Sequence, residues 1–543
     1  MGKLSSLLKL KPFVRKYKTI FILGILGMVL ASLIETPVPY IIGHITDKVL
    51  IGKGKYSELY EYLGAIAVLY ILSYGISIAA RYAFVKISSF VVNEMRYSVM
   101  KKVMDLPMSY LSSTQKGYVQ GRISECSSVG SIFSPGVIST FLSVIDASLA
   151  IITMFIINYK LAFAAVILAP LFYFSSKSST SSFMKSTKEL VESSAVLNGE
   201  CFEIINGIED IKILNAKNQH LVKFDNKLKT MVANTLKQGK SMIFFSQNIG
   251  LINDFGGLLI LLISAILILK GQFTVGLYTS FSLYITKVFS CAQAIASMGT
   301  MIKPACLNIE RLYELLDMKD ENEDKNESIT ADIDCISLDK VAFAYKEKEK
   351  KVFENLSFKI SKGEKVLLKG ENGAGKSTLI KLLIGLYPYT EGEILYNSIP
   401  VNNINTESLR EKVAVVSQNI FLFRGTVLDN ILYGLEDKKK RKDVEHIIKE
   451  LKLEEYVARF PKGIDTEISQ NTAGVSGGQA QIIAFLRAMV SGKEVIILDE
   501  PLANLDAETR ELILNILNEI QIKGILIVVS HISDNMNFRE IVL

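Results

Sequence analysis

A run of glycines followed by a lysine, a serine and a threonine has the clearest chemistry in this 543-residue sequence. The run is Gly370, Glu371, Asn372, Gly373, Ala374, Gly375, Lys376, Ser377 and Thr378. It separates an apolar stretch, Val366–Leu368, from a helix-like one, Leu379–Leu386, which predicts a strand, a turn and a helix N-terminus. Glycine lets the backbone amides of such a turn approach phosphate oxygens. We expect Lys376 to contact the β- and γ-phosphates of a nucleoside triphosphate and Ser377 to offer its hydroxyl to Mg²⁺.

Four more polar residues follow apolar segments in the second half of the chain, namely Gln418, Asp499, Glu500 and His531. If these segments are parallel strands, the residues gather at the carboxyl edge of one sheet. Asp499 is then placed to hold Mg²⁺, and Gln418 to contact the metal or a phosphate. We expect Glu500 to polarise the attacking water and His531 to bond the γ-phosphate.

Two further features fit the same interpretation. Tyr345, about one strand pair before the glycine loop, is placed to stack its ring on adenine. A second helix N-terminus that suits an anion is opened by Ser476, Gly477, Gly478 and Gln479. Taken singly, a tyrosine, a glutamine or a histidine is more often an ordinary structural residue. Their joint occurrence in this order is what indicates an ATP site.

The first three hundred residues have a different character, because they contain the excess of the hydrophobic residues that form 49% of the chain. Apolar stretches long enough to span a bilayer are Thr19–Thr46, Leu59–Tyr82, Ile132–Ile157, Leu161–Phe174, Met242–Leu269 and Phe273–Met298. A chain of this length requires two or three domains. We therefore expect an α-helical membrane domain with six transmembrane helices, followed by a soluble domain.

The soluble half has the pattern of an α/β fold. Short apolar segments alternate there with helical patterns, which favours a mostly parallel sheet with strands at Val366–Leu368, Val413–Val416, Val495–Leu498 and Ile525–Val529. Residues 317–334 are acidic and almost free of apolar side chains, as is typical of a linker. The expected division is a membrane domain at 1–317, a linker at 318–335 and a P-loop ATPase domain at 336–543.

The distribution of charge predicts where the chain resides. Lysine and arginine are concentrated at the N-terminus and in two long connections, Arg81–Gly130 and Ser175–Lys240, which places these segments and the ATPase domain in the cytoplasm. The net charge of +6 comes without a basic stripe of interleaved aromatics, so nucleic acid is not an expected partner. The five cysteines lack metal-ligand spacing, and no cleavable signal is evident. We expect a multi-pass protein of the bacterial cytoplasmic membrane.

These motifs resemble those of the ABC transporters, and the resemblance covers nearly the whole chain. Tyr345 resembles the A-loop, Gly370–Thr378 Walker A, Gln418 the Q-loop, Val475–Gln479 the signature, Val495–Glu500 Walker B, Ala503–Asp506 the D-loop and His531 the H-switch. The stretch Gln418–Ile431 resembles exporters in particular. In the membrane half, Leu106–Pro107, Gly117 and Arg122 resemble the first intracellular loop, Gly207–Lys212 the second, and Arg311–Asp317 the end of the sixth helix.

The sequence departs from the family pattern at a few positions. The signature begins with Val475 where leucine is usual, and Ala480 and Ile482 stand where basic residues are common. Before the signature, glycine, glutamate and glycine are replaced by Ser469, Gln470 and Thr472. The sequence ends directly after an expected strand at Arg539–Leu543, and no protease-like domain precedes the first apolar stretch, so leader-peptide cleavage is not expected.

The resemblance implies a half-transporter of the exporter type that hydrolyses ATP with Mg²⁺ and works as a dimer. Each ATP would lie between Walker A of one chain and Ser476–Gly478 of the other. Since Glu500 and His531 are both present, a homodimer would have two competent sites, although a different half-transporter is the alternative partner. Short helices near Ser109–Gly117 and Ile208–Lys217 would transmit closure to the membrane. A peptide exporter, a lipid flippase or multidrug pump, and an ATP-gated channel or sensor remain open.

Glu35, Asp146, Asp254 and Lys287 are charged residues that lie inside the apolar stretches. An ionised side chain that faces lipid costs several kcal/mol, so such residues usually face a watery cavity. Three acids against one lysine would make the cavity negative, which favours a cationic or amphipathic substrate such as a basic peptide. The alternative is structural, with Lys287 paired to one acid and the others at helix ends or protonated.

Overall fold

The structure, a computed structural model, describes residues 4–543 apart from 115, 346–350, 372, 436–438, 469–474, 504 and 531–535. Its contacts divide the chain into two compact units. The first comprises Met1–Lys101 and Gly117–Asp317, and the second comprises Lys102–Lys116 and Met318–Leu543. The acidic segment that follows Asp317 therefore packs within the second unit, together with part of the first expected cytoplasmic connection.

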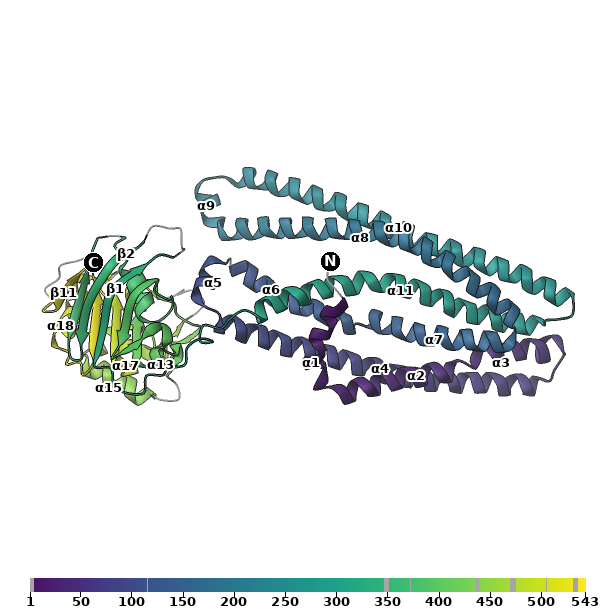
Figure 1. The fold of residues 1–543 in the computed structure, drawn as a ribbon, viewed down its shortest axis with the longest axis horizontal. Coiled ribbons are helices and arrows are strands. Elements are labelled where there is room, and N and C mark those ends of the chain that lie inside the picture. Colours follow the sequence, from purple (N-terminus) through teal and green to yellow (C-terminus); the bar gives the residue numbers. More distant parts are fainter. Residues whose placement is uncertain are drawn as a thin grey trace. The chain divides into compact units, whose positions relative to one another are not determined.

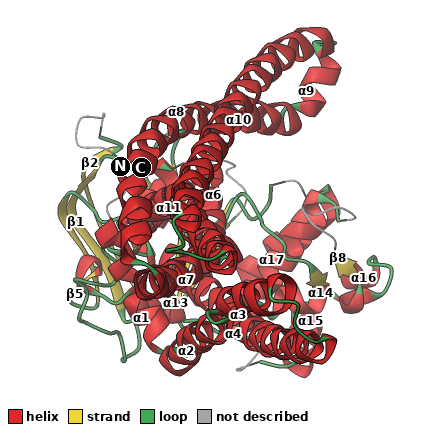
Figure 2. Ribbon diagram, turned by 90° about the vertical axis from the view of Figure 1, so that its right-hand side faces the viewer, coloured by secondary structure: helices red, strands yellow, loops and turns green. Residues whose placement is uncertain are grey.

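The first unit consists of helices, several of them very long (Figure 1). They are η1 (Leu4–Leu10), α1 (Lys11–Arg15), α2 (Lys18–Glu35), α3 (Val38–His44), the π-helix η2 (Ile45–Ile51), α4 (Tyr56–Asp105), α6 (Lys116–Val129), η3 (Gly130–Phe133), α7 (Pro135–Ile157), α8 (Tyr159–Asn206), α9 (Ile208–Ile213), α10 (Lys217–Leu269) and α11 (Val275–Leu316). The last turn of α4 and the first residue of α6 belong to the second unit. Among the described residues, all strands (yellow in Figure 2) belong to the second unit.

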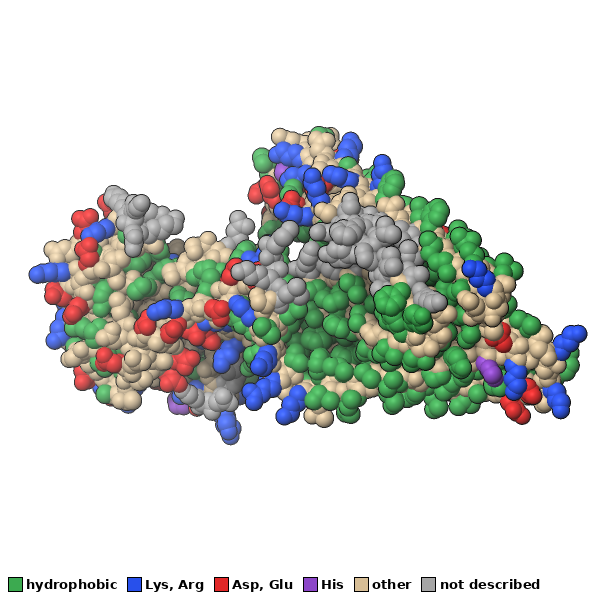
Figure 3. All heavy atoms as spheres, turned by 45° about the vertical axis from the view of Figure 1, so that its right-hand side comes forward, with side chains coloured by type: hydrophobic (Ala, Val, Ile, Leu, Met, Phe, Trp, Pro, Cys, Tyr) green, Lys and Arg blue, Asp and Glu red, His purple; other side chains and the backbone are tan. Residues whose placement is uncertain are grey.

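The helices of the first unit match the length and polarity of a bilayer. Among the described residues, four segments are long and apolar enough to cross one, namely Lys18–Ile51, Tyr56–Asp105, Tyr118–Ile157 and Lys217–Leu269. Apolar side chains cover much of the face seen in Figure 3, and Leu23 and Ile71 are 61% and 71% exposed. Such a surface is stable in lipid and unfavourable in water. The remaining stretches fall in α8 and α11, so the count of six spans stays a prediction.

Two packing arrangements organise the first unit. Helices α8 and α10 lie along each other, with the short α9 at their tip (Figures 1 and 2). Helix α11 packs against α7 and α3, and its buried Tyr284 donates to the carbonyl of Thr36 at 2.7 Å. Asp47 caps the start of α11 by accepting from the amide of Gly276 at 2.7 Å.

The second unit contains three sheets. Their strands are β1 (Cys335–Phe343), β2 (Phe353–Ser361), β3 (Lys365–Lys369), β4 (Glu391–Tyr396), β5 (Ile399–Pro400), β6 (Val413–Val416), β7 (Gly425–Thr426), β8 (Glu467–Ile468), β9 (Val495–Asp499), β10 (Ile525–Val529) and β11 (Arg539–Val542). The main sheet is parallel, with the order β11-β3-β10-β9-β6. An antiparallel sheet has the order β2-β1-β4-β5, and β7 pairs with β8. The four strands expected from the sequence are confirmed.

Helices cover the parallel sheet and position the site. They are α12 (Lys376–Leu383), η4 (Val401–Asn403), α13 (Thr406–Lys412), α14 (Val427–Ile431), α15 (Arg441–Glu450), α16 (Glu454–Ala458), η5 (Gly463–Asp465), α17 (Gly477–Ser491) and α18 (Ala507–Glu519), while α5 (Met108–Ser113) follows α4. Successive residues of β9 enter different cores, since Ile496 packs in the core that contains α17 and Ile497 in the core that contains α12. A strand buried on both faces requires the unbroken apolar run that the sequence provides.

Candidate functional site

The candidate ATP site lies at the carboxyl edge of the parallel sheet. The glycine loop follows β3, Ser530 follows β10, Glu500 follows β9 and Ser417 follows β6. These four strands are neighbours in one parallel sheet, and Val529 of β10 is in register with both Leu368 and Asp499. The parallel arrangement therefore brings the polar strand ends together, as the sequence predicted.

The glycine loop has the backbone geometry of a phosphate cradle. Gly373 and Gly375 have φ values of +89° and +91°, which side-chain-bearing residues adopt only with strain. Gly375 is the N-cap of α12, and a Cβ there would overlap the side chains of Val352 and Phe353. Helix α12 therefore begins directly at the loop, where its amides and dipole favour an anion. Asn372 lies outside the described residues.

Lys376 is held inside this loop. The residue is 7% exposed, and its ammonium group donates to the carbonyl oxygens of Gly370 at 2.7 Å and Glu371 at 3.0 Å. The two carbonyls keep the positive charge next to the loop amides. A phosphate entering the cradle would meet this charge.

Ser377 and Asp499 form the second part of the site. The hydroxyl of Ser377 donates to Oδ2 of Asp499 at 3.0 Å, and Asp499 is buried. A hydroxyl beside a carboxylate, with the amide of Gln418 at the neighbouring strand end, supplies the oxygen ligands that Mg²⁺ prefers. These residues fit the metal that the sequence predicted.

Glu500 lies next to Gln418, whose amide Nε2 donates to its carboxylate at 2.9 Å. The backbone of Glu500 is left-handed, with φ at +53°. Gln481 of α17, which is 2% exposed, donates to the carbonyl of Glu500 at 3.3 Å. Sequence analysis missed Gln481, although a glutamine inside the apolar stretch of this helix was a signal for a buried polar contact.

Tyr345 lies beside the start of α12. Its hydroxyl and that of Thr378 are 3.0 Å apart, and the residue is 41% exposed. The ring of Tyr387 meets it edge-on at 5.3 Å, and the ammonium of Lys381 lies 5.7 Å from its centroid. An exposed aromatic ring fixed in this way offers a surface for stacking. Tyr387 and Lys381 were not anticipated, because nothing in their local sequence marks them.

The signature segment forms a helix N-terminus of its own. Ser476 and Gln479 make a capping box, in which Gln479 N donates to the serine hydroxyl at 3.2 Å and Ser476 N donates to the glutamine side chain at 2.9 Å. Ser476 and Gly477 are exposed, and Gly478 is partly buried. The hydrogen bonds found among the described residues do not join this segment to the glycine loop. His531 and residues 469–474 lie outside the described residues.

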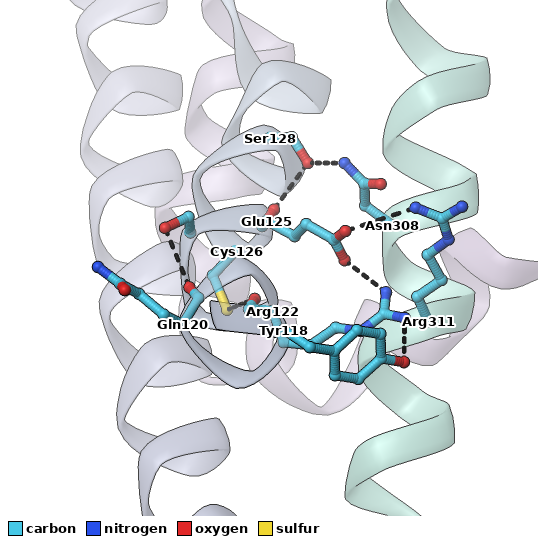
Figure 4. Close-up of polar contacts among 9 residues, drawn as sticks. Tyr118, Gln120, Arg122, Glu125, Cys126, Ser128, Asn308 and Arg311 are labelled. Carbon is cyan, nitrogen blue, oxygen red and sulfur yellow. Dashed lines mark hydrogen bonds and ion pairs between the residues drawn. The ribbon is translucent and has the colours of Figure 1, made fainter. Parts of the chain in front are cut away.

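A polar cluster connects the two segments that resemble the first intracellular loop and the end of the sixth helix (Figure 4). Arg122 of α6, 7% exposed, donates to Glu125 at 2.9 Å and to the hydroxyl of Tyr118. The other carboxylate oxygen of Glu125 accepts from Arg311 of α11 at 3.5 Å. One turn away, Asn308 of α11 donates to the Ser128 hydroxyl at 2.6 Å. Glu125 was not singled out from the sequence.

The first unit contains a cavity of about 480 Å³ between α2, α4 and α7. The charged and hydroxyl-bearing residues that line it are Ser32, Glu35, Tyr70, Ser73, Tyr74, Ser77, Arg81 and Asp146. Asp146 accepts a hydrogen bond from Ser32, and Lys287 of α11 is 3.4 Å from Glu35. Two of the four predicted cavity residues therefore line it, and Lys287 joins them through an ion pair.

The predicted charge balance of this cavity is different in the structure. Asp254 is exposed on α10 and does not line the cavity, whereas Arg81 does. Arg81 shares one face of α4 with Tyr70, Tyr74 and Ser77, because these positions repeat at helical spacing. The acidic residues Glu35 and Asp146 are therefore accompanied by the basic residues Arg81 and Lys287. The ion pair of Lys287 with Glu35, the last residue of α2, agrees with the structural alternative.

The architecture and the nucleotide site define a transport ATPase with its membrane region in the same chain. The family model of the ABC transporter transmembrane region matches residues 21–293, and the ABC transporter model matches residues 353–503. The chain belongs to the ABC transporter family. It is an integral membrane protein and a half-transporter that binds and hydrolyses ATP to drive transport.

Similar proteins come from several bacteria. The chain is 26% identical to an ATP-dependent lipid A-core flippase of Haemophilus ducreyi, over 96% of this chain and 90% of the relative. It is 27% identical to the lactococcin-A transport/processing ATP-binding protein LcnC of Lactococcus lactis, over 97% and 73%. A solved bacterial Atm1-family ABC exporter with ATP bound has the same fold, with a TM-score of 0.80 at 20% identity over 95% of this chain and 91% of that chain.

Proposed function

We propose that the chain exports an amphipathic molecule with a cationic group from the cytoplasm, as a homodimer in the bacterial cytoplasmic membrane. The observation that carries the proposal is the cavity of about 480 Å³, a size that suits a small organic molecule or part of a larger one. Asp146 offers it a carboxylate, while Tyr70 and Tyr74 offer aromatic surface. A cation meets both a negative charge and ring faces there.

ATP hydrolysis in this proposal depends on two chains. In one chain, Lys376 binds the β- and γ-phosphates, and Glu500 orients the water with the help of Gln418. The Ser476–Gly478 segment of the other chain, exposed at Ser476 and Gly477, closes on the γ-phosphate. Ser377, Asp499 and Gln418 would hold Mg²⁺, which would supply positive charge beside the phosphates. A two-fold dimer completes two such sites.

A lipid flippase is the second candidate, and Arg81 favours it. A guanidinium group at the edge of a membrane cavity suits the phosphate of a lipid headgroup. The relative from Haemophilus ducreyi is named as a lipid A-core flippase, whereas the relative from Lactococcus lactis is named for lactococcin-A transport. The balanced charges of Glu35, Asp146, Arg81 and Lys287 are compatible with a zwitterionic molecule.

The ATPase activity of the protein in liposomes distinguishes these candidates. Tetraphenylphosphonium, a basic amphipathic peptide and an anionic phospholipid are compared as stimulators at equal membrane concentration. We expect the lipophilic cation or the basic peptide to stimulate hydrolysis most, and Asp146→Asn to remove that stimulation. Stimulation by the anionic lipid alone, lost in Arg81→Gln, would replace export of a cation by lipid flipping.

A further inference from the structure

Polar contacts fix the last turn of α4 to the segment that follows α11. Lys102 forms an ion pair with Asp320 at 2.6 Å and donates to the carbonyl of Met318. The amide of Glu321 donates to the carbonyl of Asp105, the last residue of α4, at 2.8 Å. All these residues belong to the second unit. A displacement of the end of α4 would therefore move the backbone of Glu321 directly.

The side chain of Glu321 makes a second set of contacts, on α13. Its two carboxylate oxygens accept from Nη1 and Nη2 of Arg410 at 2.7 Å and 3.0 Å. The hydroxyl of Thr406, a fully buried residue, lies 3.1 Å from the same carboxylate and 2.8 Å from the side-chain oxygen of Asn322, and the two acceptors share its one proton. The side chain of Glu321 is 16% exposed. A bidentate pair of this kind is both strong and specific in its geometry, and partial burial protects it from screening.

Arg410 lies three residues before the start of β6, the strand that leads to Gln418. Helix α13 ends at Lys412 and β6 begins at Val413 with no intervening residue. Lys493 bonds the carbonyl oxygens of Arg410 at 2.7 Å and Val413 at 3.2 Å, which ties the helix to the strand. One residue, Ser417, separates Gln418 from the end of β6, and Gln418 donates a hydrogen bond to Glu500.

We infer that Glu321 is a positioning residue that couples the membrane helix α4 to the hydrolytic site through Arg410, β6 and Gln418. In its middle part, α4 lines the membrane cavity with Tyr70, Tyr74 and Arg81. At its C-terminal end, Glu321 links the last turn of this helix to α13. The inference rests on the proposed function, because it requires that the cavity changes during the ATP cycle.

A purely structural role for Glu321 predicts a different result from a coupling role. If Glu321 only holds α4 and α13 together, its replacement should lower the stability of the protein and leave the link between ATP hydrolysis and the membrane cavity intact. If Glu321 is a positioning residue, its replacement should leave ATP hydrolysis intact and abolish the ATP-dependent change in the membrane cavity. Coupling residues of this type change the coupling between sites by a factor of about 2 to 30.

Four variants separate these roles. Glu321→Gln keeps the size of the side chain and an acceptor for Thr406 but loses the charge that Arg410 needs. Arg410→Lys keeps the charge and loses the bidentate geometry. Glu323→Gln is the matched control, because Glu323 is an exposed acid of the same segment whose carboxylate contacts only the Asp320 amide among the described hydrogen bonds. The exchange Glu321→Arg with Arg410→Glu tests whether the pair itself matters.

A cysteine introduced into the cavity reports whether the cavity changes during the ATP cycle. Ser77→Cys is introduced into the full chain after the five native cysteines are replaced by serine, and its maleimide labelling rate is measured with and without ATP plus vanadate. ATP hydrolysis is measured in the same preparations. In the parent we expect the labelling rate to change on trapping. In Glu321→Gln and Arg410→Lys we expect this change to shrink by at least about threefold while hydrolysis persists.

Each possible result either supports or overturns the inference. The inference is supported if Glu323→Gln behaves as the parent and the charge exchange restores part of the response. It is overturned if Glu321→Gln keeps the full ATP-dependent change, or if the change and the hydrolysis rate fall together and the exchange restores neither. A parent protein that hydrolyses ATP without any change at Ser77→Cys would contradict the proposed function itself and, with it, the inference.

Discussion

The side-chain amide of Gln418 donates to the carboxylate of Glu500 at 2.9 Å, which joins the ends of β6 and β9. Glu500 adopts a left-handed backbone, a conformation that costs a non-glycine residue about 1–2 kcal/mol. Its amide donates to the carbonyl of Val529 at 2.9 Å, and its carbonyl accepts from Gln481. Strain of this kind persists where several contacts hold a residue in place, and it is frequent at functional sites. These contacts hold the Glu500 carboxylate in one position at the site.

The first prediction concerns Glu500 as the general base. Glu500→Gln keeps the shape of the side chain and removes its basicity, so ATP binding should persist while turnover falls by about 10²–10⁴-fold. Dimers with trapped ATP should accumulate. Hydrolysis and nucleotide retention are measured on the purified protein in liposomes. Turnover near that of the parent would refute this role.

The second prediction concerns the composite site. Lys376→Ala and Ser476→Arg damage opposite halves of one shared site, so mixed dimers contain one intact site. Mixing the two inactive variants should therefore recover part of the ATPase activity. Mixed dimers are verified with two affinity tags. If they form and remain as inactive as either variant alone, head-to-tail pairing is wrong.

The third prediction concerns the cluster of Figure 4. Removing the partner of a buried charge costs more than removing an exposed one, and the side chain of Arg122 is 9% exposed whereas that of Arg311 is 45% exposed. Glu125→Gln should therefore lower stability by about 1–3 kcal/mol. Arg311→Gln should lower it by about 0–1 kcal/mol.

A thiol-reactive dye can follow this unfolding, because Cys126 of α6 and Cys306 of α11 are buried and the chain has no tryptophan. Apparent melting temperatures of the two variants and the parent are compared at one heating rate. Equal effects of Glu125→Gln and Arg311→Gln would show that the shared carboxylate is not what stabilises Arg122.

The fourth prediction concerns the cavity. Glu35→Gln and Asp146→Asn should weaken the stimulation of ATPase activity by tetraphenylphosphonium and spare basal hydrolysis, since both residues line the cavity. Asp254→Asn is the matched control, because Asp254 is exposed on α10 and does not line it. An unchanged response in Glu35→Gln and Asp146→Asn, or a loss in Asp254→Asn alone, would remove this cavity from the substrate path.

The nucleotide site could be predicted from the sequence because its residues follow strands that are recognisable as apolar runs. Gln418, Asp499 and Glu500 meet simply because neighbouring parallel strands end at one edge. The contacts between Glu321 and Arg410 and between Glu125 and Arg311 could not be predicted in this way. They join residues 89 and 186 positions apart, and packing sets them without any local pattern.

The membrane half was less predictable for a related reason. Arg81 stands at the end of an apolar stretch, where a basic residue is usually a flank that reaches the interface. In the structure α4 continues past Arg81, and helical spacing from Tyr70, Tyr74 and Ser77 places it on the cavity face. Asp254 was included because it lies within an apolar stretch, although the face of α10 that it occupies is not evident from its position in the sequence.

Transport in inside-out vesicles tests the central claim most directly. The parent protein should accumulate radiolabelled tetraphenylphosphonium inside such vesicles against its gradient when ATP is supplied, and vesicles with Glu500→Gln should not. A matched preparation with a collapsed membrane potential excludes passive distribution of the cation. Accumulation that depends on ATP and on Glu500 is the result that an exporter predicts. ATP-dependent equilibration without accumulation, at an intact rate of hydrolysis, would contradict export and indicate a gated channel.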